Sequence, residues 1–221
     1  RRSLQEIFAM RSCMWRRQES SPRGTVYKTL QKAYNTVISA VFRAACDGQK
    51  GISMNLRVVI FQGEEAYIKK FVDFPDQLYI KRERMRDKQA EAALLRGRHC
   101  LSRTAEVWGI LVFNREKTVG RCMASFYDGD DHGFFGFFEC IENQEVCHRL
   151  VGAVGKLAKQ RSRTSLIGPV DVSFWMNYRL KIDHFGNPHT AEPYNKEYYF
   201  RLLQAEGFSV MEEYISDIYS V

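Results

Sequence analysis

Hydrophobic and polar positions follow two different periods from residue 55 onward. Continuous apolar runs or a period of two predict strands at 55–61, 106–114, 118–127, 134–141, 165–172 and 210–221. Three-and-four spacing predicts helices at 64–79, 84–96, 143–160 and 195–206, the last one stopping at Gly207. Three consecutive strands joined by tight turns are antiparallel neighbours, and the helix at 143–160 then crosses over to a parallel strand. The fold class is therefore α/β (α+β), with a mixed, mostly antiparallel central sheet flanked by helices.

The first 53 residues have a different pattern. Apolar residues recur with helical spacing from Val26 to Ala45, and Asp47-Gly48 ends the run. We therefore expect an N-terminal amphipathic helical extension over residues 1–53 and one main domain over residues 54–221. Three roles are open for this basic extension: docking to a partner or to the main domain, binding an acidic surface or membrane headgroups, or targeting.

Charge separates the same two regions. The net charge is +7, and residues 1–53 carry all of it, with 10 Lys and Arg against 3 Asp and Glu, whereas residues 54–221 hold 23 of each sign. Nucleic acid is therefore not the expected partner of the main domain. The six cysteines form no CxxC pair, which favours reduced thiols and a cytoplasmic location. No apolar run is long enough for a membrane span, and the N-terminus has no secretory signal pattern.

Several sequence blocks between residues 55 and 221 are shared with one known family. They are Phe71-Val72-Asp73-Phe74-Pro75, Val119-Gly120-Arg121, Gly133-Phe134-Phe135-Gly136-Phe137-Phe138-Glu139, Gly168-Pro169, Pro193-Tyr194-Asn195-Lys196-Glu197-Tyr198-Tyr199 and Glu206-Gly207-Phe208. The chain resembles a bacterial branch, of unknown substrate, of the GNAT superfamily of N-acetyltransferases. The block GFFGFFE is the most specific of these matches.

This resemblance implies that the domain is an N-acyltransferase, a transferase that moves an acetyl or other acyl group from acyl-CoA to an amine on a small molecule. Acetyl-CoA or another acyl-CoA is then expected between the strands at 134–141 and 165–172, held by free backbone groups of the first strand. The implied cofactor contacts are Phe137, Phe138, Cys140, Arg149 and Asn195. The resemblance is also compatible with a homodimer.

Two positions depart from the family pattern. No glycine occurs between Ile141 and Gly152, where the family has a glycine-rich pyrophosphate loop, and Glu142 and Glu145 add negative charge there. Leucines replace the tyrosine that protonates the leaving thiolate. Arg149 offers partial compensation for the first departure, and Tyr198 and Tyr199 are local substitutes for the second. The alternative is therefore a GNAT-fold binding or accessory module without CoA chemistry.

Acyl transfer to an amine requires a base and an acid. Glu139 is the candidate base, and its bland alternative is an ion pair with Arg121. Tyr199 is the candidate acid, and its alternative is aromatic packing of the last helix. The loop at 173–194 is either a surface excursion or a substrate lid, with Trp175, Asn177, Tyr178 and Tyr194 as substrate contacts. We predict no metal, because the loop's acids and histidines (Asp183, His184, His189 and Glu192) share no regular face.

Overall fold

The computed structural model describes residues 9–18, 54–80, 86–186 and 192–217. Within these ranges the strands are β1 (Ala9–Gln18), β2 (Leu56–Phe61), β3 (Ala105–Asn114), β4 (Lys117–Tyr127), β5 (His132–Cys140), β6 (Ser165–Gly168), β7 (Leu180–Lys181) and β8 (Ser209–Asp217). The helices are α2 (Glu65–Asp73), α3 (Lys88–Leu95), α4 (Gln144–Gln160) and α5 (Tyr198–Ala205), with 3-10 turns at Phe74–Gln77 and Cys100–Arg103.

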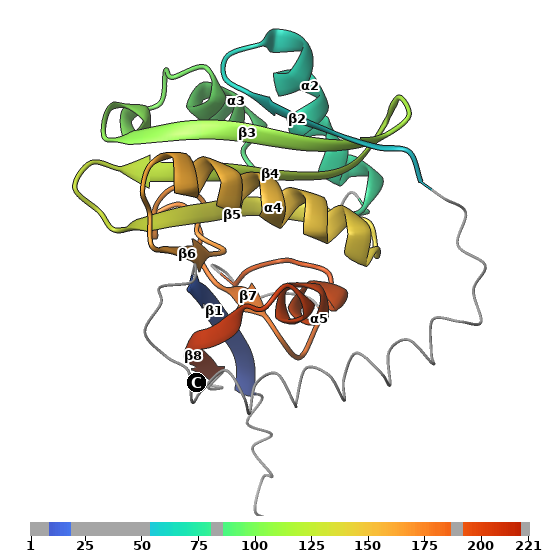
Figure 1. The fold of residues 1–221 in the computed structure, drawn as a ribbon. Coiled ribbons are helices and arrows are strands. Elements are labelled where there is room, and N and C mark those ends of the chain that lie inside the picture. Colours follow the sequence, from blue (N-terminus) through green and yellow to red (C-terminus); the bar gives the residue numbers. More distant parts are fainter. Residues whose placement is uncertain (1–8, 19–53, 81–85, 187–191, 218–221) are drawn as a thin grey trace, which may run out of the picture. The chain divides into compact units, whose positions relative to one another are not determined.

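One mixed sheet of eight strands organises the described residues (Figure 1). Strands β2 to β5 form an antiparallel meander, and β5 then pairs in parallel with β6. The crossover between β5 and β6 contains α4, because a parallel connection requires a long return path. This order confirms the predicted mixed, mostly antiparallel sheet flanked by helices.

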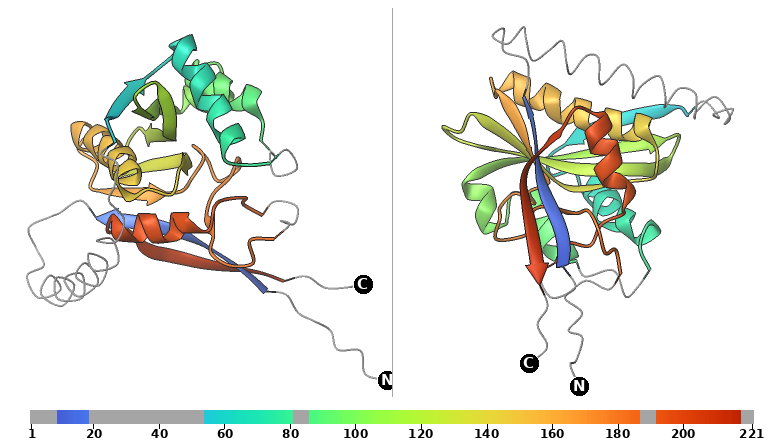
Figure 2. Two further views of the ribbon diagram at one scale, coloured as in Figure 1. Left: turned by 90° about the vertical axis from the view of Figure 1, so that its right-hand side faces the viewer. Right: turned by 90° about the horizontal axis from the view of Figure 1, so that it is seen from below.

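Helices cover both faces of the meander. Helix α4 lies on one face, and α2 and α3 lie on the other (Figure 2). The α4 stripe that the sequence predicts is buried, with Val146, Leu150, Val154 and Leu157 each at most 5% exposed. On the opposite face, a core cluster packs α2 and α3 against the strands, and it includes Phe61, Ile68, Phe71, Leu94, Leu111 and Phe113.

The N-terminal residues differ from the predicted helical extension. Residues 9–18 form β1, which pairs antiparallel with β6, β7 and β8. The boundary placed between Ser53 and Met54 therefore cuts between strands of one sheet, and residues 9–18 belong to the same compact unit as the described residues from Leu56 onward. Pairing with strands that lie far away in the sequence determines the conformation of residues 9–18. The predicted helix between Val26 and Ala45 lies outside the described residues.

The strand predicted at 165–172 is shorter than its apolar run. Strand β6 ends at Gly168, and β7 continues along the same edge of β1 after an intervening segment, residues 169–179. We call this segment the excursion. Because β8 pairs with the whole of β1 from Ala9 to Arg16, β6 and β7 share the other edge of β1. The predicted loop at 173–194 thus contains a short strand.

None of the helices described is both long and apolar enough to cross a membrane. Cys100, Cys122, Cys140 and Cys147 are free thiols.

Candidate functional site

The candidate site is built on an irregularity of β5. Arg121 pairs with Glu139 and Met123 pairs with Gly136, so two residues of β5, Phe137 and Phe138, face the single residue between Arg121 and Met123 on β4. This is a β-bulge, a feature that redirects side chains and locally ends strand pairing. Phe137 has φ 48°, which is uncommon for a residue with a side chain. The bulge comes directly before Glu139, the candidate base.

Two tyrosines hold the Glu139 carboxylate. The hydroxyl of Tyr199 donates to Glu139 Oε2 at 2.6 Å, and the hydroxyl of Tyr79 donates to the same oxygen at 2.7 Å. Glu139 is 8% exposed and Tyr199 is fully buried. No hydrogen bond to Glu139 Oε1 is present among the described residues, so this oxygen retains its capacity to accept a proton. The structure thus joins the candidate base and acid by a hydrogen bond.

Burial dominates the electrostatics of this group. It raises the pKa of Glu139, although the charge of Arg121 and the two tyrosine hydrogen bonds oppose this rise. Burial and the negative charge of Glu139 also raise the pKa values of Tyr79 and Tyr199 well above their usual range. A carboxylate whose pKa is raised is a stronger base, and both tyrosine hydroxyls are protonated before any reaction.

The edge of β5 that faces β6 is occupied by groups of the chain itself. The Phe135 carbonyl accepts from the Val170 amide at 2.8 Å, and the Phe137 amide donates to Asp171 Oδ1 at 2.5 Å. Beyond the bulge, the Cys140 amide donates to the Tyr199 hydroxyl at 3.2 Å. The Cys140 carbonyl accepts from Tyr198 at 2.8 Å.

Intramolecular partners therefore take the backbone groups that the resemblance assigns to an acyl-CoA. The excursion covers the strand edge before the bulge, and α5 covers it after the bulge. Phe138, another implied cofactor contact, is a packing residue. It is 6% exposed, and its ring packs against Phe135 and Tyr199.

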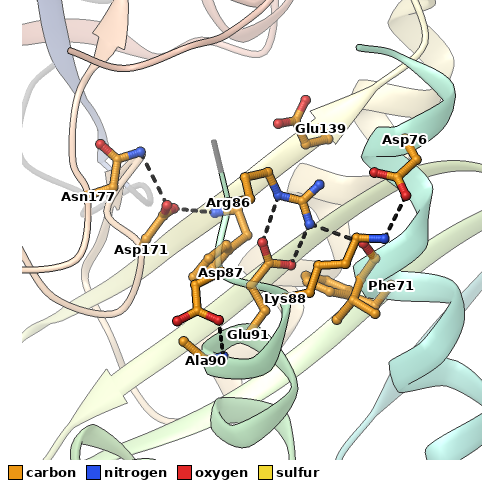
Figure 3. Close-up of polar contacts among 12 residues, drawn as sticks. Phe71, Asp76, Arg86, Asp87, Lys88, Ala90, Glu91, Glu139, Asp171 and Asn177 are labelled. Atoms are coloured by element: carbon orange, nitrogen blue, oxygen red, sulfur yellow. Dashed lines mark hydrogen bonds and ion pairs between the residues drawn. The ribbon is translucent and has the colours of Figure 1, made fainter. Parts of the chain in front are cut away.

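Asp171 connects the excursion to the bulge. Its second oxygen accepts from the side-chain amide of Asn177 at 3.3 Å, as Figure 3 shows. Burial raises the pKa of Asp171 to about 6, and the hydrogen bond from the Phe137 amide counteracts this rise. Asn177, a predicted substrate contact, thus supports the carboxylate that closes the bulge.

A buried ion-pair network lies beside the bulge. Arg121 donates to Glu91 at 2.6 Å and to the Phe71 carbonyl at 2.9 Å. Arg86 forms two hydrogen bonds of 2.8 Å with Glu91, as Figure 3 shows. Arg121 and Glu91 are 1% and 2% exposed. The sequence predicts an ion pair with Arg121 as the alternative role of Glu139. Arg121 instead pairs with Glu91 and donates to the Phe71 carbonyl.

The start of α4 does not fit a diphosphate. Asn143 caps this helix by accepting from the Val146 amide at 3.1 Å, which takes one of the free amides of the first turn. Arg149, the predicted phosphate contact, pairs instead with Glu145 at 2.8 Å on the exposed face of its own helix. Nor is there a glycine that would let a phosphate approach the backbone closely.

Asn195, another predicted cofactor contact, forms hydrogen bonds with the backbone of β7. Its side chain accepts from the Lys181 amide at 2.8 Å and donates to the Lys181 carbonyl at 3.1 Å, so it extends the pairing of β7. Tyr194 packs its ring edge-on against Tyr79, with ring centroids 5.7 Å apart. Tyr194 therefore contacts one of the two tyrosines that bind the Glu139 carboxylate.

The other predicted substrate contacts lie on the excursion. Trp175 is 95% exposed and does not anchor the segment to the domain. Tyr178 packs against Phe174 and Tyr214. Within the described ranges, no group of three or more His, Cys, Asp or Glu side chains is placed to hold a metal ion.

Sequence reasoning missed Tyr79 and Asp171. Tyr79 contacts a residue 60 positions away, and nothing in its local pattern separates it from a core aromatic. Asp171 does carry a signal, because it is an acidic residue just after a buried strand, where parallel strands diverge and ligand sites form.

Two solved structures with low sequence identity resemble the fold. A tandem GNAT protein from the clavulanic acid biosynthesis pathway, solved without AcCoA, shares 9% identity with a TM-score of 0.48 over 93% of this chain and 52% of that chain. A functionally unknown conserved protein from Staphylococcus epidermidis ATCC 12228 shares 8% identity with a TM-score of 0.43 over 94% of this chain and 60% of that chain. The chain thus spans between half and two thirds of the length of each. No protein-family model and no curated protein matches the sequence.

Proposed function

We propose that the domain is an N-acyltransferase that moves an acyl group from a thioester, with acyl-CoA as the expected donor, to an amine on a small molecule. The observation that carries this proposal is the direct hydrogen bond between Glu139 and Tyr199 at the β5 bulge. The reaction forms a C–N bond, breaks a C–S bond and moves one proton from nitrogen to sulfur. A hydrogen-bonded base and acid can perform that transfer without any net change in the protein.

Glu139 and Tyr199 divide this work between the two oxygens of the carboxylate. Glu139 Oε1, which has no hydrogen bond within the described part of the chain, takes the proton from the amine. Tyr199 gives its hydroxyl proton to the leaving sulfur. A half-turn of the protonated Glu139 carboxyl group then brings its acidic hydrogen to the side of Tyr199, and Glu139 returns this proton to the tyrosinate across the 2.6 Å contact. Tyr79 is a positioning residue, because it holds Oε2 at 2.7 Å and so leaves Oε1 without a hydrogen bond from either tyrosine.

This proposal concerns the acyl end of the donor and not the residues that bind the rest of the acyl-CoA. The acyl end suits Glu139 and Tyr199, whereas the first turn of α4 does not suit a diphosphate, as described above. Both site residues are buried. Binding therefore requires movement of the excursion or of α5 away from the β5 edge.

The alternative is a binding or accessory module without CoA chemistry. The occupied β5 edge favours it, because four backbone groups of Phe135, Phe137 and Cys140 already have partners. The pairing of Arg149 with Glu145 favours it as well.

Thiol release and calorimetry separate the two functions. The full chain is titrated with acetyl-CoA, with CoA as the control, and then assayed for thiol release with a panel of small amines. If Glu139 is the base, Glu139→Gln lowers amine-dependent thiol release by about 100-fold or more. The matched control Glu142→Gln leaves it unchanged, since Glu142 is exposed and pairs with Arg201.

The pH profile gives a second readout. Activity is expected to rise as pH increases through the raised pKa of Glu139, because the base must lose its proton first. Absence of acetyl-CoA binding at millimolar concentration, together with no thiol release from any amine, would leave the binding module as the function.

A further inference from the structure

Strand β2 lies at one end of the sheet (Figure 1). It pairs with β3 along its whole length, from Leu56 to Phe61, and no strand of the described residues pairs with its other edge. Its apolar side chains are half-buried except for Phe61, whereas the neighbouring β3 is buried along most of its length. An edge strand directs the N–H and C=O groups of alternate residues outward, so the β2 edge can accept a further strand.

Two cations share one aromatic ring beside this edge. Arg57 of β2 lies directly opposite Phe113 of β3, and its guanidinium carbon is 4.8 Å from the centre of the Phe113 ring. Lys70 of α2 approaches the same ring, with its Nζ atom 5.5 Å from the centre. Both residues are exposed, and neither forms an ion pair with a carboxylate of the described residues. Because two positive charges near one ring repel each other, an anion beside them would be stabilised.

The turn between β3 and β4 brings two further cations to the same corner of the sheet. Asn114 is the register partner both of Leu56, at the start of β2, and of Lys117, at the start of β4. Arg115 follows Asn114 in the turn, and both Arg115 and Lys117 are exposed. Glu116 adds one negative charge, so the corner stays positive. We call Arg57, Lys70, Arg115 and Lys117 the basic corner.

The basic corner differs from the rest of the domain, where cations and carboxylates are matched. Residues 54–221 carry no net charge. Arginines outside the corner that have a carboxylate partner include Arg96, Arg149, Arg161, Arg179 and Arg201. None of the four cations of the basic corner has such a partner in the described part of the chain. Their charge is therefore available to another molecule.

We propose that the β2 edge binds an extended acidic segment of another protein, which adds to the sheet as a further strand. The backbone of this segment would pair with the outer edge of β2, and its Asp or Glu side chains would lie against the basic corner. A second copy of β2 offers no carboxylate, since Arg57 is the only charged residue of this strand. A nucleic acid or an anionic lipid surface would meet the charge but cannot pair with a strand edge. This binding does not depend on acyl transfer.

The first test compares two labelled peptides on the full chain. One alternates glutamate and valine over about ten residues, the length of a long strand. In the other, proline replaces every valine, which keeps the charge but removes half of the backbone donors. Fluorescence polarisation is expected to show saturable binding of the first peptide and about tenfold weaker binding of the second. Hydrogen exchange is expected to slow at the β2 amides with the first peptide alone. Residues 1–53 are basic as well, so the readout is this difference between the peptides.

The second test removes the charge of the corner. The double variant Arg57→Gln with Lys70→Gln is expected to bind the glutamate-valine peptide about tenfold more weakly, with a smaller difference at high salt. The matched control, Arg98→Gln with Arg103→Gln, removes two exposed arginines outside the corner and leaves the affinity unchanged.

Three results would contradict the proposal. Equal affinity for the two peptides, or unchanged exchange at β2, would overturn strand addition, and this comparison holds even if a variant fails to fold. Equal loss of affinity in the two double variants, or no loss in either, would overturn the role of the basic corner. Tighter binding of a single-stranded oligonucleotide or of phosphatidylserine vesicles, lost in the Arg57 and Lys70 variant, would make that class of molecule the partner instead of an acidic protein segment.

Discussion

Substitution of Gly136 by alanine tests how tightly the excursion closes the β5 edge. A Cβ atom at Gly136 would lie 2.1 Å from the Val170 carbonyl oxygen and 2.7 Å from Asp171 Cα. Real Cβ atoms essentially never approach closer than 3.0 Å, so the excursion or β5 must move by about 1 Å. Both atoms belong to the backbone, which cannot rotate away as a flexible side chain can.

The magnitude follows from the two hydrogen bonds that this movement breaks. The neutral bond from the Val170 amide to Phe135 contributes about 1 kcal/mol, and the bond from the Phe137 amide to Asp171 contributes about 1.5–3 kcal/mol because its acceptor is a carboxylate. We expect Gly136→Ala to reduce the free energy of unfolding by about 2.5–4 kcal/mol, which lowers Tm by roughly 5–15 °C for a chain of this size.

The assay combines denaturant unfolding with amide hydrogen exchange. The Phe137 amide is expected to lose most of its protection in Gly136→Ala, while amides in the middle of β3 keep theirs. Gly152→Ala is the matched control: Gly152 lies in α4 with no atom within 4 Å of an added Cβ, so it should gain about 0.5–1 kcal/mol. Wild-type stability and wild-type Phe137 protection in Gly136→Ala would refute the proposed closure.

Three further changes test the surrounding charges and the loop tip. Because the pKa of Asp171 rises to about 6 on folding, its ionised form is disfavoured in the folded state, and the stability from this group falls as pH rises from about 4 to 6. Asp171→Asn should therefore add about 1–3 kcal/mol at pH 7.5 and little at pH 4 in urea unfolding, and an equal change at both pH values would contradict this cause. Glu91→Gln should lower the free energy of unfolding by about 3–5 kcal/mol, since it leaves Arg121 buried without its carboxylate. The ion pairs of Lys88 are half-exposed, so Lys88→Gln should lower it by less than about 1 kcal/mol. Similar losses in the two variants would argue against a buried network. Trp175→Ala should leave Tm unchanged within about 1 °C, because its side chain is exposed. A large drop in Tm would contradict this exposed position.

The elements of the meander could be predicted because each has a local signal. The helical spacing of α4 and its capping residue Asn143, which accepts from the Val146 amide, lie next to each other in the sequence. Strand β1 has no comparable signal. Its partners are β6, β7 and β8, at the other end of the chain.

The candidate site was predictable only in part, for the same reason. Glu139 and Tyr199 could be selected from the sequence because each sits in a block that resembles a family motif. Their mutual contact, and the part that Tyr79 plays in it, depend on how β5, α5 and the turn after α2 pack together. The occupancy of the β5 edge was not predictable either, because three of its partners are backbone atoms or tyrosine hydroxyls without a sequence motif.

The excursion has a consequence for how the chain could change over evolution or by engineering. On β1, only Met14 separates Trp15, the partner of Gly168, from Cys13, the partner of Leu180. The sheet therefore requires a single residue between β6 and β7, and the remainder of residues 169–179 is an insertion that the strand tolerates. A shortened chain that joins Gly168 to Leu180 through one residue would keep the register of β1 while uncovering Phe135 and Phe137. Access to the β5 edge up to the bulge is thus encoded in one contiguous, replaceable segment rather than in the sheet that surrounds it.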